Sequence, residues 1–90
     1  MTKNDIVVRI AKETGQSYKD VRRIVQRTFD SVVEALATEG KIELRNFGVF
    51  KVRRRQARKA RNPRTGEPVQ VQAYNTVVFK PGLTMQEKIR

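Results

Sequence analysis

The sequence of 90 residues contains no cysteine and no histidine. Their absence excludes disulfides, thiol chemistry, the usual structural zinc sites and every mechanism that uses a histidine as acid or base. Acidic residues are also few, nine against 20 lysines and arginines. We therefore expect neither an enzyme nor a bound metal or cofactor.

Long apolar runs are absent as well. Residues 1–16 are polar and charged, so the sequence predicts no signal peptide and no membrane-spanning segment. A chain without thiols fits a reducing cytoplasm, which is the expected location. Ninety residues form one domain with a small core, and we expect a partner subunit to supply part of the buried surface.

Positive charge is concentrated in the second half of the chain. Residues 1–50 hold nine basic and seven acidic residues, whereas residues 51–90 hold eleven basic and two acidic ones. Residues 51–64 contain eight basic side chains and no acid. Such a field attracts a polyanion, and DNA, RNA and an anionic membrane are the candidates. Solubility alone does not require basic residues to be separated from acidic residues along the chain in this way.

Two helices are predicted within residues 1–40. Thr2 with Asp5 three residues later resembles a capping box, and Gly15 is typical of a helix end. Ser17 with Asp20 repeats the start signal. An amphipathic stripe then keeps a 3.6-residue period for about five turns and ends at Gly40, through Val21, Ile24, Val25, Thr28, Phe29, Val32, Val33 and Leu36.

The second helix is not typical of the recognition helix of a helix-turn-helix motif. Its stripe is wide and long, and its basic residues Arg22, Arg23 and Arg27 lie only in the first half. Two helices and a short sheet scarcely cover such a stripe. The stripe therefore favours dimerisation through this helix and the sheet.

From Lys41 onward the apolar period changes to two, which predicts strands. A turn is expected at residues 46–48, where Asn46 and Gly48 both tolerate a positive φ. The alternating apolar positions are Ile42 and Leu44, Phe50 and Val52, then Val69, Val71 and Ala73, and finally Val77 and Phe79. Residues 83–90 are expected to form a short terminal helix.

Residues 53–73 are predicted to form a two-stranded ribbon that turns at residues 62–66. Pro63 fixes φ in this turn, and Gly66 permits a positive φ. The outer half has almost nothing to bury, so we expect an arm that stays mobile until a polyanion neutralises it. A rigid proline ring at the end of a basic arm also suits insertion between base pairs from the minor groove.

The chain resembles the HU/IHF family of bacterial histone-like DNA-bending proteins. The resemblance rests on "NFGVFKV", "ARKARNPRTGEPVQV" and "VVFKPG", and it extends in register from "MTKNDIV" to "FKPG". It implies an α+β fold with two N-terminal helices, a three-stranded antiparallel sheet with a long β-ribbon arm, and a short C-terminal helix, in an intertwined dimer. The single domain, 1–90, would comprise a helical dimerisation part (1–40), a sheet with an arm at about 53–73 (41–82), and a terminal helix (83–90).

The same resemblance implies which residues contact DNA. Pro63 would intercalate. At the tip, groove edges and backbone would be contacted by Arg61, Asn62 and Arg64. Along the arm, phosphates would be contacted by Arg53, Arg55, Arg58 and Lys59. DNA that flanks the bend would be contacted by Lys3 and Lys80. The aromatic dimer core would comprise Phe29, Phe47, Phe50 and Phe79.

Some positions depart from the family pattern. Asn46 stands where many relatives have glycine, and Ala60 replaces a common glycine or proline, which stiffens the arm. The segment "QAYNTVV" matches no single branch, and Glu43 and Arg45 occur in both HU-like and IHF-β-like patterns. A non-specific homodimer and a site-preferring, heterodimeric subunit therefore both stay open.

The expected function is architectural: nucleoid-associated binding that bends duplex DNA with little sequence specificity and favours bent, nicked or flexible DNA. An RNA-binding protein is the alternative from another class, but no strand carries the aromatic pair on which single-stranded bases stack. A membrane-surface protein would need a basic amphipathic helix, whereas this charge lies on a ribbon.

Overall fold

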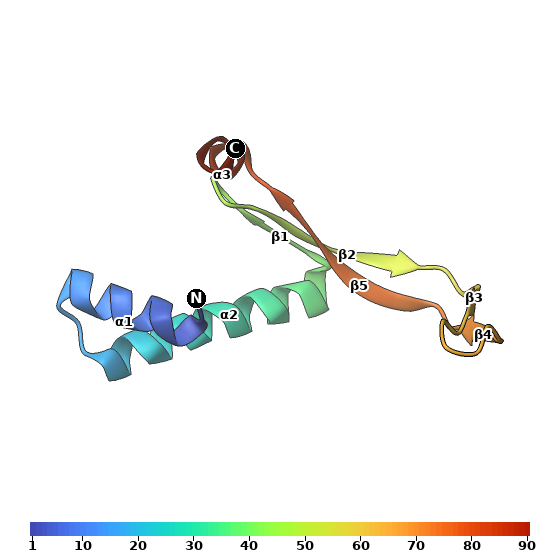
Figure 1. Ribbon diagram of the computed structural model, residues 1–90. Coiled ribbons are helices and arrows are strands. Elements are labelled where there is room, and N and C mark those ends of the chain that lie inside the picture. Colours follow the sequence, from blue (N-terminus) through green and yellow to red (C-terminus); the bar gives the residue numbers. More distant parts are fainter. The chain divides into compact units, whose positions relative to one another are not determined.

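The computed structural model describes residues 1–90 and contains two helices, five strands and a final helix (Figure 1). The chain divides into a helical unit, residues 1–38, and a sheet unit, residues 39–90. None of the three helices is both long and apolar enough to span a membrane.

The first helix, α1 (Lys3–Thr14), has the predicted ends. The Thr2 hydroxyl accepts a hydrogen bond from the Asp5 amide at 3.3 Å, and the Asp5 carboxylate accepts one from the Thr2 amide at 2.7 Å. Gly15 closes the helix with a φ of 71°, and its amide donates to the Ala11 carbonyl at 3.0 Å. These contacts satisfy backbone groups that a helix end otherwise leaves unpaired.

The second helix, α2 (Tyr18–Glu39), begins after Ser17, whose hydroxyl accepts from the Asp20 amide at 3.1 Å. Val7 of α1 and Val21 of α2 are the only buried large apolar side chains in the whole chain. Farther along α2, Ile24 and Val33 are each 65% exposed. Half of the eight residues in the predicted apolar stripe are therefore exposed, and only Val21 is buried.

Three strands form the predicted antiparallel sheet, in the order β1 (Lys41–Leu44), β2 (Gly48–Arg55) and β5 (Tyr74–Pro81). Ile42 lies opposite Phe50, and Phe50 lies opposite Phe79. The helix α3 (Leu83–Ile89) follows Gly82, whose amide donates to the Phe47 carbonyl at 2.9 Å. The terminal helix therefore begins beside the turn between β1 and β2.

The β1–β2 turn uses only one of the two residues that tolerate a positive φ. Asn46 has the positive φ, 66°, that the turn needs, but Gly48 is not among the residues with a positive φ. Gly48 is required for space instead. A Cβ atom there would lie 2.6 Å from both the Lys80 carbonyl oxygen and the Phe79 ring, closer than packed atoms allow.

Alternation along the strands gives the sheet an apolar face. Phe47 of the turn joins Phe50 and Phe79 in an aromatic cluster, with ring centroids 4.6 Å apart for Phe50 and Phe79 and 5.6 Å apart for Phe47 and Phe79. None of the three rings is buried: Phe47 is 47% exposed and Phe79 is 37% exposed. The sheet unit thus forms its aromatic cluster but leaves it uncovered.

The arm is a two-stranded antiparallel ribbon, β3 (Arg58–Arg61) with β4 (Pro68–Val71), beyond the ends of β2 and β5 (Figure 1). The ribbon predicted over 53–73 is present, and its ladder is interrupted at residues 56–57 and 72–73. Two residues are unpaired on each side of the ribbon, so the pairing resumes beyond them in the same register and without a bulge. The skipped segments are Gln-Ala pairs, which offer no branched or aromatic cross-strand contact.

Candidate nucleic-acid interface

The second face of the sheet is basic. Lys41 lies opposite Lys51, and Arg53 and Arg55 follow at alternate positions of β2, while Lys80 projects from β5 opposite Val49. Residues directly opposite one another in an antiparallel pair share a face, so these cations define a basic face: Lys41, Lys51, Arg53, Arg55 and Lys80. Glu43, opposite Val49, is the one acidic residue that shares it.

A hollow of about 600 Å³ lies on the basic face, lined by Lys41, Val49, Lys51, Arg53, Val78, Phe79, Lys80 and Pro81. The chain contains two ion pairs, Arg23 with Asp20 and Arg27 with Glu34, and both lie in α2. No lysine or arginine of the sheet unit has an acidic partner within ion-pair distance. The basic face therefore keeps a net positive charge that attracts a polyanion.

The arm carries cations on both of its faces. Lys59 and Arg61 share one face with Gln70 and Pro68, and Arg58 lies on the other with Val71. All three basic side chains are exposed. The arm therefore has almost no core, because its two strands contain only four apolar residues: Ala60, Pro68, Val69 and Val71.

Asn62 organises the tip of the arm. Its side-chain oxygen accepts from the Arg64 amide at 2.9 Å, and its carbonyl accepts from the Gly66 amide at 2.7 Å. Gly66 has the predicted positive φ, 74°, and its carbonyl accepts from the Arg61 guanidinium at 3.3 Å. Pro63 is exposed inside this braced turn. The tip therefore presents a rigid ring on a backbone that its own hydrogen bonds hold.

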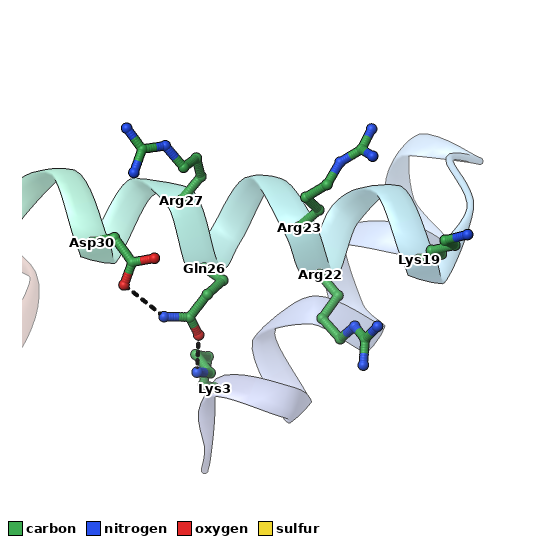
Figure 2. A pocket seen from close by; sticks show the side chains of 7 residues that line it. All are labelled: Lys3, Lys19, Arg22, Arg23, Gln26, Arg27 and Asp30. Carbon is green, nitrogen blue, oxygen red and sulfur yellow. Dashed lines mark hydrogen bonds between the residues drawn. The ribbon is translucent and has the colours of Figure 1, made fainter.

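A separate basic cluster lies in the helical unit, around a hollow of about 550 Å³ that is lined by Lys3, Lys19, Arg22, Arg23, Gln26, Arg27 and Asp30 (Figure 2). The Lys3 ammonium donates to the Gln26 side-chain oxygen, and the Gln26 amide donates to Asp30 at 2.9 Å. Figure 2 shows Arg22 on the side of α2 that faces α1, whereas Arg23 and Arg27 extend from the other side.

Sequence reasoning assigned only Lys3 of this cluster to DNA contact. Of the others, Arg23 and Arg27 are four residues apart and therefore lie on the same side of α2. The remaining predicted contacts, from Arg53 to Arg64 together with Lys80, all lie in the sheet unit. The predicted aromatic core is divided in the same way, because Phe29 lies on α2 and the other three rings form the sheet cluster.

Comparison with known proteins shows the class of protein to which the chain belongs. Residues 1–90 match the family described as Bacterial DNA-binding protein. The chain is 40% identical over 90 residues to DNA-binding protein HU of Geobacillus stearothermophilus, with both chains covered completely.

Solved structures agree with this class. A cocrystal structure of Anabaena HU with DNA matches with a TM-score of 0.90 at 29% identity, covering 99% of this chain and 97% of that one. A mutant of Thermotoga maritima HU matches with a TM-score of 0.73 at 31% identity, with both chains covered completely. The chain therefore belongs to the HU family of bacterial DNA-binding proteins, whose members are architectural.

Proposed function

We propose that this architectural protein bends duplex DNA from the minor groove with two β-ribbon arms, one from each chain of a homodimer, and that Pro63 intercalates at each bend. The observation that carries the proposal is a basic face that leads into a basic ribbon with an exposed proline at its braced tip. The solved complex of Anabaena HU with DNA supports DNA as the ligand.

The free energy of such bending must come from phosphate contacts. Smooth bending of a short duplex costs about 1–6 kcal/mol, and unstacking at an inserted proline costs roughly a few kcal/mol more. Arg53, Arg55, Arg58, Lys59, Arg61 and Arg64 have no acidic partners, so they are free to neutralise phosphates. Neutralising about 6–10 phosphates releases enough counterions to make affinity fall by roughly 10³–10⁵ between 50 and 200 mM salt.

Dimerisation would cover the apolar surface that each unit leaves open. The helical unit exposes Ile24 and Val33, and the sheet unit exposes Phe47 and Phe79. Exposed apolar surface of this extent marks an interaction site. Association of two chains through these faces would complete both cores and give the dimer two arms.

Low sequence specificity follows from the side chains that the interface offers. Base edges are read best by bidentate pairs in the major groove, whereas contacts to phosphates carry no sequence information. The cations along the arm suit phosphates. The side-chain oxygen of Asn62 already accepts a hydrogen bond from the Arg64 amide within the turn. We therefore propose that the protein favours bent, nicked or flexible DNA and associates with the nucleoid.

Two measurements test the proposal together. Sedimentation of the purified chain, 10.4 kDa, should give the mass of a dimer. Fluorescence transfer between the ends of short duplexes should then report bending of random sequences. A monomer, or a duplex that stays straight at saturation, would contradict the proposal. Strong preference for one defined duplex would favour a site-preferring subunit, and stronger competition by structured RNA would favour an RNA-binding protein.

A further inference from the structure

Tyr74 is an aromatic residue with no role in the molecule described so far. It lies in "QAYNTVV", is 47% exposed, and makes no side-chain hydrogen bond. Its ring takes no part in the aromatic cluster of the sheet. The other tyrosine differs, because the Tyr18 hydroxyl donates to the Asn4 side chain and ties α2 to α1.

The surroundings of Tyr74 form a charged hollow at the base of the arm. Tyr74 lies opposite Arg55 in the last pair of the β2–β5 ladder, so both side chains share the basic face. The ladder breaks immediately beyond them, and a hollow of about 480 Å³ is lined there by Arg55, Gln56, Arg58 and Tyr74. This volume falls within the range of roughly 300–1,000 Å³ typical of small-ligand sites.

A purely structural role accounts for only part of this arrangement. Tyrosine suits a strand, and its position opposite Arg55 ends the ladder. That role does not require the ring to stand open beside two guanidinium groups, neither of which has an acidic partner. A half-exposed aromatic ring suits stacking with a base, and two arginines that line the same hollow suit binding of a phosphate.

We propose that this hollow binds one unpaired nucleotide of DNA, with its base stacked on Tyr74 and its phosphate held by Arg55 and Arg58. The inference rests on the proposed binding of DNA by the arm. Every base has a π face that stacks on an aromatic ring, and guanidinium groups bind phosphate oxygens in a bidentate manner. Gln56 supplies an amide that can donate to, or accept from, the edge of the base.

The subsite would discriminate between kinds of DNA. In an intact duplex each base is stacked and paired, so it reaches Tyr74 only after an unfavourable extrusion. At a gap the unpaired base has already lost its partner. Tyr74 would therefore strengthen binding to gapped DNA specifically, separately from the flexibility that a gap gives to the duplex.

The test compares two gapped duplexes that differ only in the base opposite a single-nucleotide gap. One retains the base, and the other carries an abasic residue with the same backbone phosphates. The wild type should bind the first more tightly by about 5- to 150-fold, the affinity ratio expected for stacking one base on an aromatic ring. Tyr74→Leu should abolish this ratio, whereas Tyr74→Phe should retain it.

Further measurements distinguish stacking from loss of structure. Tyr74→Leu should bind the intact duplex as tightly as the wild type, and Arg55→Gln should weaken binding to both gapped duplexes by the same factor. With 2-aminopurine as the unpaired base, binding should quench its emission in the wild type but not in Tyr74→Leu.

A ratio that Tyr74→Leu leaves unchanged would overturn the inference, as would an equal loss of affinity for intact and gapped DNA. Wild-type binding to duplex DNA without any preference for the retained base would overturn the inference alone. Failure of the wild type to bind any of these duplexes would overturn the proposed function and this inference with it.

Discussion

Neutralising two cations of the arm should make DNA binding less sensitive to salt. The double variant Arg58→Gln and Lys59→Gln removes one cation from each face of β3. Both side chains are exposed and have no acidic partner, so the folded chain loses no ion pair. If both contact phosphates, each bound arm releases about two fewer counterions.

The magnitude follows from the slope of log affinity against log salt concentration. That slope is about −0.9 for each neutralised phosphate, so it should become shallower by about 1.8 for each bound arm. Between about 50 and 200 mM salt, the loss of affinity should therefore shrink by about 12-fold per arm.

Fluorescence anisotropy titrations of a labelled duplex at several salt concentrations measure this slope. The matched control is Lys12→Gln with Lys88→Gln, which removes the same charge from the last turns of α1 and α3. The control has the same net charge as the arm variant, so long-range attraction is equal in the two variants. It should keep the wild-type slope, because it leaves every cation of the arm in place. An unaltered slope for the arm variant, or an equal change in the control, would take β3 out of the interface.

Four further outcomes are expected. Pro63→Ala should retain most of the affinity but lose much of the bend seen by end-to-end fluorescence transfer, and an unchanged bend would leave Pro63 as a turn residue only. Gly48→Ala should lower the free energy of unfolding in urea by about 1–3 kcal/mol, because its Cβ atom would lie 2.6 Å from the Lys80 carbonyl oxygen. Gly82→Ala should lower the free energy of unfolding by less, because its Cβ atom would lie 3.3 Å from the Phe47 carbonyl oxygen. Equal losses of stability in the two variants would refute the steric argument. Thr2→Ala should lower the unfolding free energy by about 1 kcal/mol through loss of its cap, which an unchanged urea midpoint would contradict. Phe79→Ser should shift sedimentation toward the monomer, and unchanged self-association would exclude the sheet cluster from the dimer interface.

Local features of the structure were readable from the sequence because their causes lie within a few residues. The caps of α1 depend on Thr2, Asp5 and Gly15, each within one helical turn of the backbone group it satisfies. The positive φ at Gly66 was likewise predictable from the tip itself. The steric role of Gly48 could not be read from the sequence, because its constraint comes from Phe79 and Lys80, which are distant in the sequence.

The sequence by itself determined the helices, the alternating strands, the basic arm and the family resemblance, because composition, period and motif order are properties of neighbouring residues. Only the tertiary structure decided which side chains meet. The register places Arg55 opposite Tyr74, and the interruption beyond them opens a hollow that also reaches Arg58. Cross-strand pairing joins residues far apart in the chain, and a shift of one residue would move each side chain to the other face of the sheet. The basic face and the Tyr74 hollow therefore exist only once the strands have paired.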